Sequence, residues 1–191
     1  MKKIILLLAA VVSLMVAQAQ HVEFKWHRCY GVAGYDFSTN LNKTDFEDKA
    51  TFHGFYAVGG WQIRKESGIG LGVEYLRDNT GAFSQMPVFI EVRSHYLRNR
   101  VTPFSTVYVG YSIPMGSSSG GDNAIQIATG GPTWGFSVGA RYAFSRKMGV
   151  SAYIGYQGIY MGRVERKVDG LLSNARPQLL QNIKVGVGFN F

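Results

Sequence analysis

Residues 133–145, TWGFSVGARYAFS, alternate between two kinds of side chain along their whole length. Successive side chains of a β-strand point to opposite faces, so the pattern predicts a strand with two unlike faces. The apolar face carries Trp134, Phe136, Val138, Ala140, Tyr142 and Phe144, and the other face carries Gly135, Ser137, Gly139, Arg141 and Ala143. A chain built from such segments is expected to fold as a sheet with one apolar side.

The same alternation recurs along the chain, whereas helical spacing of apolar residues is nowhere sustained past residue 20. We predict eight strands, which span residues 22–38, 51–64, 68–78, 86–97, 102–113, 132–145, 147–162 and 181–191. The two faces of the first strand are similarly mixed, which favours a bulge in that strand.

The connections between these strands alternate in length. Those after the second, fourth and sixth strands are short, and those after the first, third, fifth and seventh are polar and mostly longer. In an up-and-down antiparallel sheet this pattern places the long loops at one end and both chain termini at the other. The third long loop covers residues 114–131, and in the fourth a short helix is predicted at 171–180, broken by Pro177.

The composition of the faces distinguishes a membrane barrel from a soluble barrel of the calyx type. Glycine and serine dominate the polar face, which suits the crowded interior of an eight-stranded barrel better than a surface in water. The apolar face is uninterrupted and carries aromatic residues near strand ends, namely Trp134, Tyr142, Phe144, Tyr156, Phe189 and Phe191. We therefore predict an all-β fold, an eight-stranded antiparallel up-and-down transmembrane β-barrel.

The start of the chain predicts export. Lys2 and Lys3 precede the apolar run 4–17, and Ala17-Gln18-Ala19 matches a small-x-small cleavage site. The run is shorter than the roughly 20 residues of a membrane-spanning helix. We assign residues 1–19 to a signal peptide and residues 20–191 to the barrel domain; the alternative is an N-terminal membrane anchor.

Charge and cysteine content exclude further classes. The formal charge of +8 falls to +6 without Lys2 and Lys3, and the remaining cations are scattered singly, so no nucleic-acid partner is expected. A single cysteine, Cys29, excludes an internal disulfide, and it is most simply a small packed residue.

Charged residues occur on the face that would line the lumen. They are Glu74, Glu91, Arg93, Arg141 and Lys184, which we predict to form a polar cluster there. Charges in a narrow barrel need ion pairs or trapped water, so the cluster is interpreted as a plug that fixes the register of the strands. A conduit for protons or small ions remains open as an alternative, whereas eight strands leave no channel for nutrients.

No catalytic, metal or cofactor site is predicted. Ser94 and His95 are neighbours in a strand, so their side chains point to opposite faces and cannot act as nucleophile and base. The acidic segment 45–48 lacks the spacing of a calcium loop. We expect a protein that is not an enzyme, with a lipid-modifying activity as the alternative.

Three segments carry a resemblance to a known family. MPVFIEVRSHYL, TPFSTVYVGYSI and the terminal KVGVGFNF resemble small outer-membrane β-barrel proteins of Gram-negative bacteria, especially those of the Bacteroidetes type, related in architecture to the OmpA transmembrane domain and OmpX. The resemblance implies a multi-pass outer-membrane location with periplasmic termini and extracellular loops. It also implies that the barrel-assembly machinery reads the last strand through Phe191, Phe189, Val187 and Val185.

The long loops are the remaining functional candidates. The fourth combines four cations with four leucines: Arg163, Arg166, Lys167 and Arg176 with Leu171, Leu172, Leu179 and Leu180. These leucines either fold over the barrel mouth as packing, or contact lipopolysaccharide phosphates or a protein partner. The expected role is structural or surface interaction, with outer-membrane lipid, lipopolysaccharide and an extracellular ligand as partners.

Overall fold

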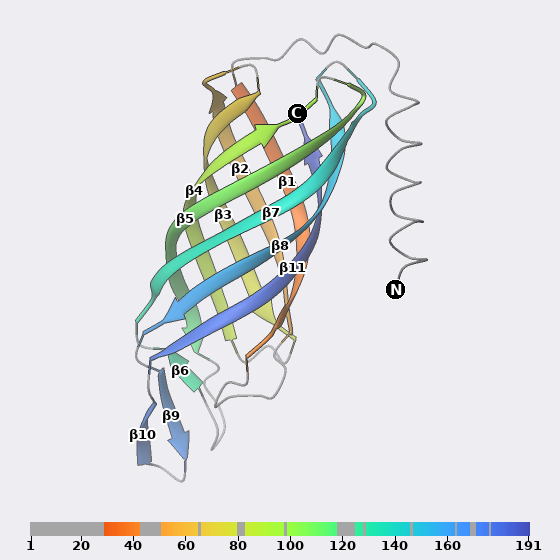
Figure 1. Ribbon diagram of the computed structural model, residues 1–191. Coiled ribbons are helices and arrows are strands. Elements are labelled where there is room, and N and C mark those ends of the chain that lie inside the picture. Colours follow the sequence, from red (N-terminus) through yellow and green to blue (C-terminus); the bar gives the residue numbers. More distant parts are fainter. Residues whose placement is uncertain are drawn as a thin grey trace.

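The computed structural model describes residues 29–42, 51–64, 66–79, 83–97, 99–117, 125–127, 129–145, 147–162, 164–168, 171–175 and 177–191. These residues form eleven strands (Figure 1). The strands are β1 (Cys29–Asn40), β2 (Thr51–Gln62), β3 (Ser67–Asp78), β4 (Phe83–His95), β5 (Val101–Ser117), β6 (Ile125–Ile127), β7 (Gly131–Ala143), β8 (Gly149–Met161), β9 (Val164–Val168), β10 (Leu171–Ala175) and β11 (Gln178–Asn190). The predicted signal peptide lies outside the described residues, and within them no helix is long and apolar enough to cross a membrane.

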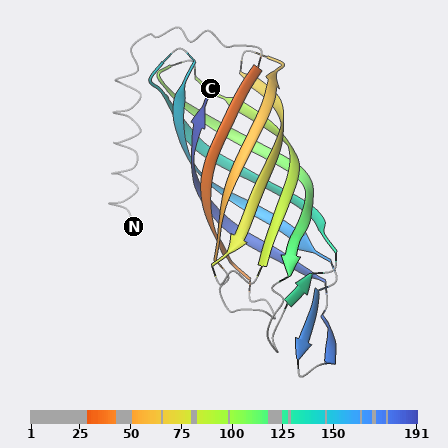
Figure 2. The same ribbon diagram turned by 180° about the vertical axis from the view of Figure 1, so that it is seen from behind.

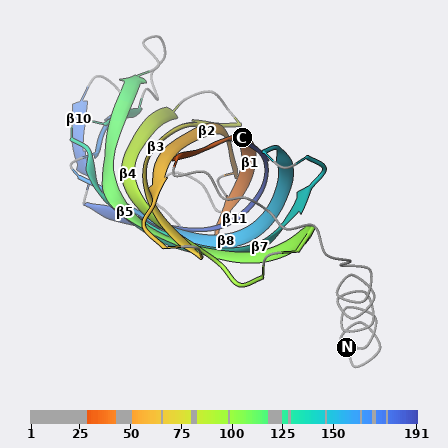
Figure 3. The ribbon, with the colours of Figure 1, turned by 90° about the horizontal axis from the view of Figure 1, so that it is seen from above.

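Eight strands close into a barrel in the order β1-β11-β8-β7-β5-β4-β3-β2, and every neighbouring pair is antiparallel. The view from behind and the view along the axis show a tilted, continuous wall (Figures 2 and 3). The barrel closes where β1 pairs with β11, from Val32 opposite Asn190 to Asn40 opposite Asn182. This arrangement confirms the predicted eight-stranded up-and-down barrel.

The ends of the barrel differ as the loop lengths predicted. Phe191 and Gly31 exchange two backbone hydrogen bonds of 2.8 and 2.9 Å at the end that also holds the short turn from Ile63 to Ser67. The described start of β1 and the end of the chain therefore lie at the short-turn end. The strands β6, β9 and β10 lie at the opposite end, below the barrel in Figure 1.

The first strand differs from expectation. Residues 22–28 lie outside the described residues, and β1 continues to Asn40 with an unbroken register against both neighbours. The described part of this strand, Cys29–Asn40, contains no bulge. The irregularity lies instead between β4 and β5, where the register shifts between Phe83 and Gln85.

The long loops contain structure that the sequence analysis missed. β5 extends to Ser117, and β10, β9 and β6 form a three-stranded sheet beyond the barrel (Figure 1). The helix predicted at 171–180 was wrong, because residues 171–175 pair with β9 and the barrel strand β11 begins at Gln178. The residues between the paired Val168 and Leu171 are Asp-Gly, which favours a two-residue hairpin over a helix.

The faces of the barrel are divided as expected. Phe55, Leu71 and Val107 point outward and are 66%, 67% and 62% exposed, and the outer wall is apolar along its length. Two expectations fail on this wall. Cys29 is exposed rather than packed, because it occupies an outward position of β1. Tyr156 lies in the middle of β8, stacked on Phe136 at 5.9 Å between ring centroids, and is not near a strand end.

Candidate functional site in the barrel lumen

The small inward residues make room for large rings. A methyl group on Gly72 would lie 2.3 Å from Phe89, and one on Gly186 would lie 2.4 Å from the ring of Tyr153. Contacts below 3 Å are not tolerated by real side chains. Glycine at these two positions is therefore a packing requirement, and it lets aromatic side chains cross the lumen.

An apolar and aromatic layer occupies the middle of the lumen. Its members are Val32, Tyr56, Val58, Phe89 and Tyr108, with Tyr30 and Tyr153 packed against them. The ring centroids of Phe89 and Tyr108 are 4.9 Å apart, and those of Tyr56 and Tyr153 are 5.9 Å apart. The sequence carried a signal for this layer: these residues are large or apolar, whereas the other inward positions are mostly small or polar.

The first charged group, which we call the Lys184 group, joins four strands across the lumen. Lys184 Nζ lies 2.6 Å from Glu74 Oε1 and 3.3 Å from Asp36 Oδ2, and all three side chains are buried. Gln157 donates a 3.2 Å hydrogen bond to Glu74, and the Tyr153 hydroxyl donates a 3.1 Å hydrogen bond to Asp36. Two carboxylates thus share one ammonium, Gln157 satisfies the second oxygen of Glu74, and Asp36 Oδ1 is buried without a hydrogen-bond partner among the described residues.

The second charged group lies within one strand. Arg93 Nε and Nη2 donate to Glu91 Oε1 and Oε2 at 2.8 and 3.2 Å, and the guanidinium lies 5.1 Å from the ring centroid of Phe104. Arg141, on β7, is also buried, with 7% of its surface exposed. The five charged residues that the sequence analysis placed in one cluster all point inward, but Glu74 and Lys184 belong to the first group and Glu91 and Arg93 to the second. Arg141 is a member of neither group.

Sequence reasoning missed Asp36, which completes the Lys184 group. Beyond it, toward the long-loop end, Ser38 Oγ and both side-chain polar atoms of Asn182 are buried without a hydrogen-bond partner among the described residues. We expect ordered water at these atoms. Buried apolar side chains then line the lumen at the long-loop end: Phe52, Leu76, Ile159, Met161 and Leu180.

The space left between the two charged groups is small. A cavity of about 30 Å³ lies among Tyr56, Glu74, Arg93, Tyr108 and Lys184. A volume of that size holds about two water molecules. The middle of the barrel is therefore packed with side chains rather than hollow.

The residues considered for catalysis do not converge. Ser94 faces outward, where its hydroxyl lies 3.2 Å from that of Ser67, whereas His95 faces the lumen with its ring 6.0 Å from Phe104. His53 lies near Asn79 at the long-loop end, with 3.3 Å between Nδ1 and Oδ1. The described residues contain no group of three His, Cys, Asp or Glu side chains that could hold a metal ion.

Comparison with known proteins supports the fold and nothing finer. No family model matches the sequence, and no curated protein matches it. Neisserial surface protein A (NspA) is similar in structure, with a TM-score of 0.62 at 14% identity over 86% of this chain and 96% of that one. OprG from Pseudomonas aeruginosa has a TM-score of 0.55 at 12% identity over 90% and 99% of the two chains.

The chain has the fold of the small outer-membrane barrels. This likeness confirms the resemblance to eight-stranded outer-membrane proteins, whereas the Bacteroidetes type stays a prediction. At such low identity the likeness carries no information on ligands or activity.

Proposed function

We propose that this protein is an integral outer-membrane barrel with a structural or surface-interaction role. In this proposal the barrel is an anchor, and the long-loop end is the part that meets partners. The observation that carries it is a contrast along the molecule. The lumen is filled by bonded and packed side chains, whereas the long-loop end is built out by the further sheet of β6, β9 and β10.

The outer wall supports the membrane setting. Large apolar side chains cover it on every barrel strand, and Trp134, Tyr142 and Phe144 lie exposed toward strand ends. A surface of this kind in water is strongly unfavourable, but it matches the hydrocarbon and interfacial regions of a bilayer. Outer-membrane lipid and lipopolysaccharide are thus the proposed surroundings of the wall.

The asymmetry of the two ends supports an orientation. Single-chain bacterial outer-membrane barrels have short periplasmic turns and longer extracellular loops. With that orientation, Phe191 and the turn from Ile63 to Ser67 face the periplasm. The sheet of β6, β9 and β10 then faces the outside, where β10 and β6 form its two edges.

Part of the fourth loop packs onto the barrel. Leu180 is 2% exposed and lies inside the mouth, so this leucine acts as packing rather than as a contact for a partner. The hairpin of β9 and β10 extends beyond the mouth (Figure 1). We propose this hairpin as the part of the loop through which an extracellular ligand binds.

A trimmed variant tests the surface role. Replacing residues 164–175 by a short Gly-Ser turn is expected to leave the heat-modifiable barrel intact and to lower cell adhesion to the level of a deletion strain. Full adhesion by the trimmed variant would refute the surface role.

Two further measurements address the alternatives. Current steps in planar bilayers would favour an ion conduit, and altered lipid A mass spectra in the deletion strain would favour a lipid-modifying enzyme. Silent recordings and unchanged spectra are expected.

We also propose that the barrel-assembly machinery reads the last strand. The side chains of Val185, Val187, Phe189 and Phe191 are all exposed on the outer wall. Deletion of Phe191 is expected to lower the amount of protein in the outer membrane, whereas Phe144→Ala, an exposed aromatic near the same end, is expected to leave it nearly unchanged. Normal levels of the truncated protein would leave Phe191 as an interfacial anchor only.

A further inference from the structure

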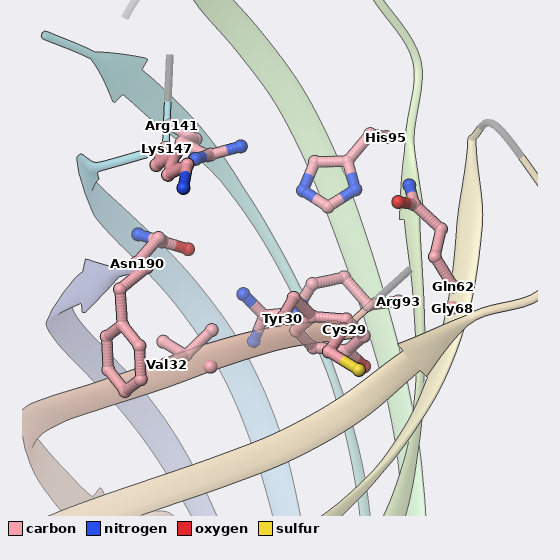
Figure 4. A pocket seen from close by; sticks show the side chains of 12 residues that line it. Cys29, Tyr30, Val32, Gln62, Gly68, Arg93, His95, Arg141, Lys147 and Asn190 are labelled. Carbon is pink, nitrogen blue, oxygen red and sulfur yellow. The ribbon is translucent and has the colours of Figure 1, made fainter. Parts of the chain in front are cut away.

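A second cavity opens at the short-turn mouth of the barrel. Its volume is about 40 Å³, and it draws side chains from five barrel strands and one turn. Figure 4 shows Arg141 and Lys147 on one side of the view, His95 and Gln62 on the other, and Arg93 and Tyr30 between them. Exposed lining residues, including Lys147 and Phe191, connect the cavity with the surface.

The charges around this cavity are of one sign. Arg93, Arg141 and Lys147 line it, and none of its described lining residues is an aspartate or a glutamate. Arg93 and Arg141 are near enough to repel each other electrostatically. Glu91 offsets the charge of Arg93, so the charges of Arg141 and Lys147 leave an excess of positive charge around the cavity.

A neutral hydrogen-bond donor, the Tyr30 hydroxyl, lies beside the cations. The Tyr30 hydroxyl is buried and has no hydrogen-bond partner within the described part of the chain. Asn190 also lines the cavity, but its Nδ2 already donates to Ser151 Oγ at 3.0 Å and to the backbone oxygens of Gly149 and Gly188 at 3.5 Å. A guanidinium has five N–H donors. Arg93 donates two hydrogen bonds to Glu91, so donors remain for a ligand.

We propose that this cavity binds a phosphate-type oxyanion, held by Arg93, Arg141 and Lys147 with the Tyr30 hydroxyl as a neutral partner. The guanidinium fork matches the geometry of a phosphate group. The volume corresponds to about three water molecules, which is room for one oxyanion group while the rest of the ligand reaches into solvent. The proposal holds whichever side of the membrane the mouth faces, so it is independent of the proposed function.

The phosphate has two possible sources, a free phosphate compound or the headgroup of a membrane lipid. The full-length protein, refolded in a neutral detergent, is titrated with inorganic phosphate in one arm. In the other arm it is titrated with a short-chain phosphatidylglycerol, and phosphatidylcholine is the control. Saturable binding of inorganic phosphate supports a site for free phosphate. Saturation by phosphatidylglycerol alone assigns the site to an anionic lipid headgroup, and saturation by neither overturns the proposal.

Variants locate the binding. Arg141→Gln is expected to weaken binding about tenfold or more, as for the loss of a charge-assisted contact. Lys147→Gln lies at an exposed turn, so it keeps the fold and is expected to weaken binding about threefold. The matched control is Arg100→Gln, because Arg100 lies on the outer wall, 5.0 Å from the Tyr142 ring centroid. Equal weakening by Arg100→Gln and Lys147→Gln would overturn the site in favour of general charge attraction.

Discussion

The Lys184 group and the short-turn mouth use the same inner face of the barrel in opposite ways. In the Lys184 group two carboxylates hold one ammonium, and the contacts of 2.6 and 3.3 Å come from three different strands. At the mouth three cations surround a cavity that no described acidic side chain lines. The first arrangement locks strands together, whereas the second leaves charge available for a ligand. Charge in a narrow lumen can therefore serve packing at one level and recognition at another.

The largest effect is expected when the ion pairs of the Lys184 group are removed. Lys184→Met removes the ammonium and leaves Asp36 and Glu74 buried without the cation that they share. The free energy of unfolding in detergent is expected to fall by about 3–5 kcal/mol, as for removal of one member of a buried ion pair. Urea titration followed by gel mobility measures the change.

The control for this variant lies on the same strand. Val185→Ala changes the lipid-facing neighbour of Lys184 and is expected to cost well under half as much. Equal destabilisation by the two variants would show that the ion pairs of the Lys184 group add no special stability to the barrel.

The second prediction concerns the ion pair that borders the mouth. Glu91→Gln removes the charge that faces Arg93 across bonds of 2.8 and 3.2 Å. The expected loss of stability is about 2 kcal/mol, smaller than for Lys184→Met because an amide oxygen still accepts one hydrogen bond. Binding of inorganic phosphate is expected to tighten, since Arg93 gains donors for the ligand. If Glu91→Gln leaves the phosphate affinity unchanged, Arg93 does not contribute to phosphate binding in the cavity.

The sequence predicted the direction of these side chains but not their grouping. Alternation placed Glu74, Arg93 and Lys184 inward because the period of a strand is two. It could not pair Lys184 with Asp36, since that contact depends on closing the first strand onto the last. Nor could it divide the charges between two levels, because the tilt and stagger of the strands set the height of each residue in a barrel.

The local sequence also explains why the helix predicted at 171–180 was wrong. Leucines at 171, 172, 179 and 180 fit a helical spacing over a short window, but residues 171–175 form one arm of a hairpin. Short apolar segments do not distinguish helix from strand by periodicity alone. The Asp-Gly dipeptide before Leu171 was the better signal.

The smallest predicted effect tests the aromatic layer in the lumen. Gly72→Ala places a methyl group 2.3 Å from Phe89 and is expected to cost about 1 kcal/mol of unfolding free energy, because the ring must shift. The matched control is Gly59→Ala, since a methyl group there meets nothing within 4 Å. Calorimetry of both refolded variants gives the comparison. Equal melting temperatures of the two variants would show that the Phe89 ring can move aside at little cost in stability.

The seam between β1 and β11 has a consequence for the order of events in folding. The first barrel strand pairs with the last, and its hydrogen bonds continue to Phe191, the final residue of this sequence. Contacts between segments so distant along the chain form slowly, because a large loop must close first. Until that moment two long strand edges are open to pairing with other chains. The chain must therefore be kept from aggregating until β11 has been synthesised and has paired with β1.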